Sequence, residues 1–174
     1  MCLRTAFLAV NYTDRYLDIA MVKKTKFQLL GATCLHVASK CEDVSYIRVE
    51  DLAMSADNVF TSVEVLRMEE KLLNALNFTL SWVVLTSVCA WRLGSGSAAL
   101  DFLDVYERLI PIIPKKTSML ARYLLELALQ ECEFLAFPPS KVAVCCLSMA
   151  LDAIDGSPMV RRSARRTGVS SHRY

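Results

Sequence analysis

The sequence predicts an all-α protein built from two halves of similar order. Apolar residues recur at helical spacing through most of the 174 residues, and no segment alternates with period two for long enough to predict a sheet. An amphipathic helix, a break and a helix of small apolar residues follow one another in the first half and again in the second. The hydrophobic content of 54% is ample for a packed core, so most of the chain is expected to be ordered.

The first half is organised around the segment Lys26–Cys41, which predicts a buried central helix. This segment, KFQLLGATCLHVASKC, lacks proline, is long enough for four helical turns and is apolar or small on nearly every face. Its small residues are expected to let neighbouring helices approach closely: Gly31, Ala32, Cys34, Ala38 and Ser39. One charged side chain, Lys40, stands at the end of this helix.

Three further helices are expected in the first half, over Leu3–Leu17, Val49–Met54 and Ser62–Leu76. Glu42–Ile47 is expected to form a loop. Thr61 precedes the last of these helices, and Glu64 follows it three residues later, which is the spacing of a capping box. The helix over Ser62–Leu76 should pack on the central helix.

The second half is predicted to repeat this arrangement. The repeated pair of helices is Ser118–Phe134 and Ser140–Ile154, and two further helices are expected between the halves, at Val83–Leu93 and Leu100–Ile110. A spacer at Gly94–Ser97, a loop at Pro111–Lys116 and a break at Pro138–Pro139 separate them. The domain division that follows is 1–80, 81–156 and a basic tail at 157–174.

Charge separates the tail from the body of the chain. The five arginines of the tail have no acidic residue among them: Arg161, Arg162, Arg165, Arg166 and Arg173. The residues up to Val160 carry 15 basic and 18 acidic side chains, a net charge of −3 that does not favour nucleic-acid binding. The tail is expected to be a solvated, disordered end, and a nuclear localisation signal is the alternative.

Cysteine usage indicates a reducing compartment. The seven cysteines are odd in number, show no CxxC spacing and lie mostly in apolar runs, so neither disulfides nor a zinc site is expected. No uncharged run is long enough to span a bilayer, and the start lacks the pattern of a secretory signal. We expect a soluble protein without a membrane partner.

The residues that enzymes need are not arranged for catalysis. The motifs HExxH, GxSxG and the Walker-type glycine loop do not occur, and His36 is expected to be a packed or interface-facing histidine rather than a base. Acidic residues occur in adjacent pairs whose side chains diverge by about 100° on a helix. No catalytic residue, metal or cofactor is therefore predicted, and a binding module is favoured.

Two charges lie on otherwise apolar surfaces of the predicted helices. Lys40 ends the central helix, and Glu69 lies beside Met68, one turn before Leu72 and Leu73. In one interpretation the two side chains snorkel to the surface or pair there. In the other they lie within an exposed apolar patch and fix a protein partner in register.

Three segments resemble successive pieces of the cyclin box and occur at that family's separations. They are LAVNYTDRYL at Leu8–Leu17, FQLLGATCLHVASKCED at Phe27–Asp43 and VLRMEEKLLNALNF at Val65–Phe78. The segment YLLELALQECEFLAFPPSKVA at Tyr123–Ala143 is similar to the second repeat of A-type cyclins. The resemblance is to A- and B-type cyclins with the A type favoured, although QLLGATC also resembles D-type cyclins.

The resemblance implies the cyclin fold, two stacked five-helix repeats with Lys26–Cys41 as the central helix of the first. The matching segments cover Leu3–Ile154, so the first repeat would lack its first helix and the second its last helices. The incomplete N-terminal cyclin box would occupy 1–80, and the incomplete C-terminal repeat 81–156.

Cyclins bind and activate cyclin-dependent protein kinases, so the resemblance implies a regulatory subunit of a kinase heterodimer. Lys40 and Glu69 match the charged pair that grips the kinase near its αC helix. Neighbouring family contact positions are Cys41, Glu42 and Leu73.

The family's second site docks substrates or inhibitors that carry an Arg-x-Leu motif. Its matching positions here are Lys24, Phe27, Gln28 and Ser55, and Ser55 makes the groove more polar. The location implied for the protein is the nucleus and cytoplasm. Three alternatives stay open: a cyclin-fold, transcription-factor-like DNA-binding module, a truncated cyclin without activating capacity, and a structural helical interaction protein.

Overall fold

A computed structural model describes residues 2–80, 99–110 and 113–155. The chain divides into two compact units, Met1–Ala98 and Ala99–Tyr174, each of which is described by itself. The prediction of an all-α protein is confirmed, because the described residues form helices and no strand. The expected helix over Val83–Leu93, the spacer at Gly94–Ser97 and the basic tail lie outside the described residues.

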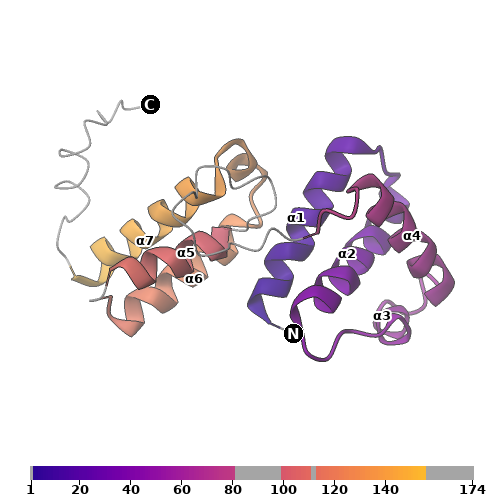
Figure 1. The fold of residues 1–174 in the computed structure, drawn as a ribbon, viewed down its shortest axis with the longest axis horizontal. Helices are drawn as coiled ribbons and strands as arrows, with labels where there is room; N and C mark the ends of the chain where they lie inside the picture. The colour runs from indigo at the N-terminus through magenta and orange to yellow at the C-terminus, as the bar shows by residue number, and fades with distance from the viewer. Residues whose placement is uncertain (1, 81–98, 111–112, 156–174) are drawn as a thin grey trace. The chain divides into compact units, whose positions relative to one another are not determined.

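The first unit places α2 between two long helices. Its elements are α1 (Leu3–Ile19), the 3-10 turn η1 (Lys24–Lys26), α2 (Phe27–Glu42), α3 (Val49–Ser55) and α4 (Ser62–Ala75). Helix α2 packs against both α1 and α4, and α3 packs on α4 (Figure 1). Helix α2, which the sequence predicted as the central helix, is therefore central in the first unit.

A side-chain cap sets the start of α4. The Glu64 backbone N–H donates to Thr61 Oγ1 at 3.3 Å, and the Thr61 backbone N–H donates to Glu64 Oε2 at 3.0 Å, so the predicted capping box is confirmed. Lys26 Nζ also donates to Glu64 Oε1 at 2.9 Å. The hydrogen bond from Lys26, followed by that from the Thr61 backbone, lowers the pKa of Glu64 to about 2.

The core of the first unit joins α1, α2 and α4. Its buried members are Leu8, Ala9, Tyr12, Tyr16, Leu30, Cys34, Val37, Ala38, Leu72 and Leu76. The Tyr12 hydroxyl donates to the Leu80 carbonyl at 2.7 Å, and burial raises the pKa of this phenol. The residues after α4 are thereby tied to α1.

One expectation about the small residues of α2 is wrong. Cys34, Ala38 and Ser39 are buried, but Gly31 is exposed, and a Cβ placed on it would have no described atom within 4 Å. The side of α2 at Gly31 is open among the described residues, so this glycine is not needed for close helix packing there.

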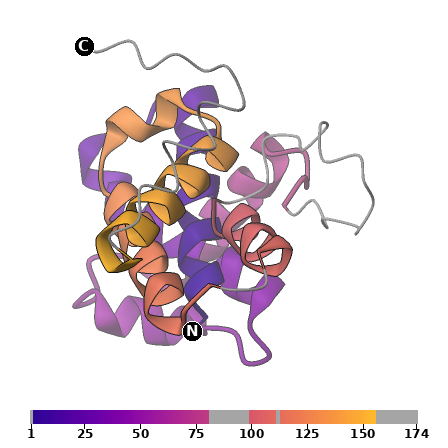
Figure 2. The ribbon, with the colours of Figure 1, turned by 90° about the vertical axis from the view of Figure 1, so that its left-hand side faces the viewer.

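The second unit has α7 against two helices. Its elements are α5 (Ala99–Leu109), α6 (Lys115–Ala128), the 3-10 turn η3 (Cys132–Ala136) and α7 (Pro139–Asp155). Helix α7 packs against α5 and α6, and α6 and α7 lie side by side in both views (Figures 1 and 2). Arg122 on α6 links α6 to α5, because its Nη2 lies 2.7 Å from both Asp104 and Glu107.

The predicted bounds of the helix at Ser118–Phe134 are wrong at both ends. The helix begins at Lys115, directly after Pro114, whose fixed φ and missing N–H suit the start of a helix. It ends at Ala128, and Glu131 is extended before η3 begins. The apolar residues after Ala128 kept a helical spacing in sequence, but Phe134 belongs to a separate 3-10 turn.

Candidate functional site

Lys40 and Glu69 form an ion pair that joins the end of α2 to the middle of α4. Lys40 Nζ lies 2.7 Å from Glu69 Oε1. The lysine side chain is 40% exposed, whereas the glutamate side chain is only 13% exposed. A carboxylate with so little water needs a fixed partner, which Lys40 supplies.

His36 lies on the other side of the same carboxylate. Its Nε2 atom is 3.8 Å from Glu69 Oε2, while the imidazole as a whole is buried. Tyr46, from the loop after α2, places its ring edge-on to the imidazole with the centroids 6.1 Å apart. Glu69 therefore has a lysine at one oxygen and a histidine near the other.

The loop after α2 is held by two polar side chains of that helix. His36 Nδ1 lies 2.6 Å from the Ile47 carbonyl, and the Ile47 backbone N–H donates to Ser39 Oγ at 3.1 Å. Both backbone polar groups of Ile47 are thus bound to α2, which fixes the loop that carries Tyr46.

The other predicted kinase contacts lie on the same two helices. Cys41 is exposed at the end of α2, and desolvation of its sulfur raises the pKa of the thiol. Glu42 is engaged within the unit, because Arg4 Nε lies 3.6 Å from its carboxylate. Leu73 is one turn after Glu69 on α4 and packs partly against the core.

The predicted docking residues lie on three elements, with Lys24 in η1, Phe27 and Gln28 in α2, and Ser55 in α3. Lys24, Phe27 and Gln28 are exposed around the start of α2, and Phe27 is 42% exposed. Ser55 ends α3, where its hydroxyl donates to the Asp51 carbonyl of its own helix at 2.7 Å. Its polar group is therefore satisfied locally.

His36 is packed, as the sequence indicated, but its position next to Glu69 and the backbone conformation of Phe78 were both missed. His36 and Lys40 are four residues apart on one helix, a spacing that places both on the same face and could have grouped them. Phe78 is 67% exposed, has a φ of 55° and donates its backbone N–H to the Leu73 carbonyl. A large aromatic side chain at positive φ is uncommon, and sequence spacing alone does not reveal it.

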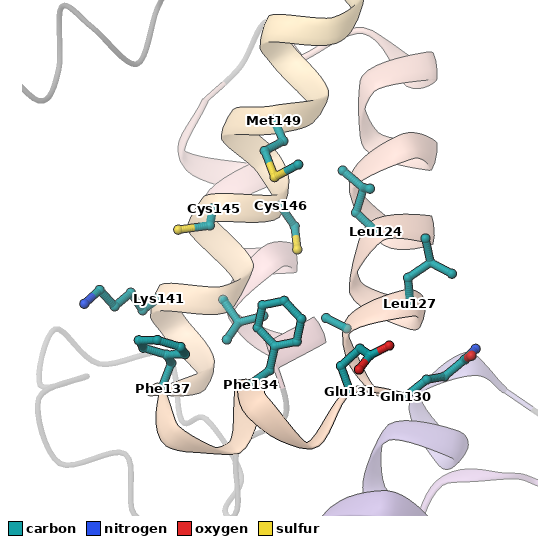
Figure 3. A pocket seen from close by; sticks show the side chains of 12 residues that line it. Leu124, Leu127, Gln130, Glu131, Phe134, Phe137, Lys141, Cys145, Cys146 and Met149 are labelled. Atoms are coloured by element: carbon teal, nitrogen blue, oxygen red, sulfur yellow. The ribbon is translucent and has the colours of Figure 1, made fainter. Parts of the chain in front are cut away.

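The second unit contains an apolar groove of about 470 Å³ between α6, η3 and α7. In Figure 3 the side chains of Phe134, Cys146 and Met149 are directed toward the space beside α6, and Lys141 points away from it. Desolvation raises the pKa of the Cys146 thiol. The groove is an exposed apolar surface with few polar groups.

Neither a metal site nor a membrane span is found in the part of the chain that the structure describes. No three side chains of His, Cys, Asp or Glu gather there as metal ligands would. None of the described helices combines the length and the apolar character that crossing a bilayer requires.

Family models match both halves of the chain. The cyclin N-terminal domain matches residues 2–81, and the cyclin C-terminal domain matches residues 98–172. The second match continues through most of the basic tail predicted at 157–174.

Curated relatives include both A-type and B-type cyclins of plants. Cyclin-A2-1 of Arabidopsis thaliana is 39% identical over 153 residues, which is 88% of this chain and 32% of the relative. Cyclin-B2-1 of the same plant is 37% identical over 153 residues, with the same two shares covered. The chain therefore spans about a third of the length of these relatives.

A solved structure of a viral cyclin from herpesvirus saimiri has the same fold. Its TM-score is 0.70 at 17% identity, and the match covers 97% of this chain and 79% of the viral chain. The two domain matches and the plant relatives confirm the resemblance to A- and B-type cyclins, and the chain belongs to the cyclin family.

Proposed function

We propose that this chain is a regulatory subunit that binds a cyclin-dependent protein kinase and activates it by holding the kinase αC helix in its active position. Membership of the cyclin family supports a regulatory rather than a catalytic role. The observation that carries the proposal is the Lys40–Glu69 pair, whose carboxylate is mostly desolvated while the ammonium group is exposed.

The pair suits a protein partner because its charges are held in place before binding. Glu69 Oε1 accepts from Lys40, and Oε2 has no hydrogen bond to it among the described residues. Lys40 keeps donors directed to solvent, so the pair offers both a donor and an acceptor to a partner backbone. Exposed Cys41 and partly exposed Leu73 supply apolar surface beside it.

Activation follows from what a kinase needs. The lysine on its strand β3 must pair with the glutamate of αC, and its activation loop must clear the substrate site. A rigid partner that binds only the arrangement with αC inward shifts the kinase population toward activity by its differential affinity. The packing of α2 against α1 and α4 gives the cyclin surface that rigidity.

Pull-down of a purified cyclin-dependent kinase, followed by histone phosphorylation, tests this function. We expect the kinase to be retained by the chain and histone phosphorylation to rise when the chain is added. Retention without a rise in phosphorylation would support a cyclin that binds but does not activate. Failure to retain any kinase that A- or B-type cyclins activate would contradict the proposal.

Docking of Arg-x-Leu peptides is a second, weaker part of this proposal. The exposed side chains at the start of α2 could contact such a peptide, but three lysines surround that start: Lys23, Lys24 and Lys26. An arginine-containing peptide would meet like charges there, which lowers its affinity. Peptide binding should accordingly be weak and should strengthen when Lys24 is replaced by an uncharged residue.

A further inference from the structure

We propose that His36 is a proton-sensitive positioning residue of the Lys40–Glu69 pair, and that protonation of its Nε2 atom lowers the affinity of this surface for its kinase partner. This inference rests on the proposed function. It uses a buried titratable side chain that the mechanism above leaves without a role.

The surroundings of Nδ1 decide which ring nitrogen can titrate. Nδ1 lies 2.6 Å from the Ile47 carbonyl oxygen, and a carbonyl can only accept. Nδ1 must therefore carry a hydrogen whether the ring is neutral or charged. Ser39 binds the backbone N–H of the same Ile47, so the carbonyl cannot easily turn away. The proton that histidine gains and loses must consequently be on Nε2.

Nε2 is directed toward the acceptor of the pair. It lies 3.8 Å from Glu69 Oε2, which is longer than a hydrogen bond, while Oε1 is bound to Lys40. The charged and titratable groups around the ring are Glu69 from α4, Lys40 from α2 itself and Tyr46 from the loop. The histidine side chain is 3% exposed, so little water screens these groups from one another.

The proton on Nε2 changes what Oε2 can do. In the neutral ring Nε2 has a lone pair, so Oε2 stays free to accept an N–H from a partner. In the protonated ring Nε2–H becomes a charged donor that moves onto Oε2 and occupies it. A partner must then displace this contact, so binding is linked to release of the proton. Affinity should fall as the pH falls.

The histidine in the chain alone gives the first test. Long-range ¹H–¹⁵N correlation spectra distinguish the two neutral tautomers, and we expect His36 to carry its hydrogen on Nδ1 at about pH 8. A hydrogen on Nε2 in the neutral ring would overturn the inference, because Nε2 would then donate to Glu69 without any added proton.

Two variants of His36 give the second test. The amide nitrogen of asparagine reaches the position of Nδ1 and can keep the bond to Ile47, but it leaves nothing at Nε2. The amide nitrogen of glutamine reaches the position of Nε2 and supplies a permanent, uncharged donor to Glu69. Circular dichroism melts of both variants establish that they fold.

Calorimetric titration of kinase into each chain at about pH 7.5 and about pH 6 then separates the outcomes. For the natural chain we expect the dissociation constant to be about three- to tenfold higher at the lower pH. One linked proton can change a dissociation constant by at most about tenfold per pH unit, so this change is within the limit. His36→Asn should bind kinase at both pH values with the dissociation constant that the natural chain has at about pH 7.5. His36→Gln should bind kinase at both pH values with the higher dissociation constant that the natural chain has at about pH 6.

The calorimetric results distinguish an error about His36 from an error about kinase binding. If kinase binds and depends on Lys40 and Glu69, yet the pH dependence of the natural chain is the same in His36→Asn, the role of His36 is contradicted and the proposed function stands. If no kinase binds at either pH, the proposed function fails. In that case the tautomer of the neutral ring still decides which nitrogen of His36 faces Glu69 without a hydrogen.

Discussion

Helices α2 and α7 have corresponding places in their units, since each packs against two other helices, but their surroundings differ. The end of α2 has Lys40 bound to Glu69, with His36 behind them. Beside α7 lies an apolar groove with few polar groups. Apolar surface contributes affinity, whereas fixed charges define the register and orientation of a partner. The difference therefore favours the first unit as the place of specific recognition.

Core and groove leucines provide the largest contrast. Leu72 is fully buried against α1 and α2, while Leu127 beside the groove is 42% exposed. Leu72→Ala should lower the free energy of unfolding by about 2–5 kcal/mol, and Leu127→Ala by less than about 1 kcal/mol. Urea denaturation followed by circular dichroism measures both. Similar losses for the two variants would show that the groove is closed in solution.

Two tyrosine hydroxyls provide a smaller contrast. Tyr12 donates to the Leu80 carbonyl at 2.7 Å, whereas Tyr106 in the second unit reaches the Ser140 carbonyl only at 3.4 Å. Tyr12→Phe should cost about 1 kcal/mol of unfolding free energy, because it leaves a carbonyl without its donor. Tyr106→Phe should cost less, since its bond is long. A larger loss for Tyr106→Phe would contradict this ranking.

Acid should weaken the first unit through Glu64. Its folded pKa of about 2 lies below the ordinary value of 4.5, so the stability it contributes is present above about pH 4.5 and is lost as the pH falls toward 2. Glu64→Gln keeps a side chain that can complete the capping box but cannot titrate. As the pH falls over that range, the melting temperature of this variant should fall less than that of the natural chain. The difference between the two should be small, because the pair with Lys26 is exposed.

Local patterns in the sequence predicted most of the described helices. The capping box could be recognised because Thr61 and Glu64 are three residues apart, and their contact depends only on local geometry. The end of α6 was missed because the apolar spacing continues into η3, and a change from an α-helix to a 3-10 turn leaves little trace in that spacing.

Contacts between distant residues were less predictable. Lys40 and Glu69 are 29 residues apart, and residue chemistry alone left two interpretations of them open. Their relation came from the resemblance to cyclins, and the structure adds that they contact each other. The position of His36 behind Glu69 depends on how α2 crosses α4, which helical spacing within one segment cannot supply.

Kinase binding by the Lys40–Glu69 pair is the central proposal for this protein. The direct measurement is calorimetric titration of a cyclin-dependent kinase into the natural chain and into Lys40→Ala combined with Glu69→Ala. The matched control is Lys26→Ala combined with Glu64→Gln, which removes a similar ion pair at the opposite end of α2 and leaves the capping box able to form.

We predict that the first double variant melts like a folded protein but binds kinase at least about a hundredfold more weakly, a loss of roughly 3 kcal/mol or more. The control should bind as the natural chain does. An unchanged dissociation constant for the folded Lys40→Ala and Glu69→Ala variant would contradict the account.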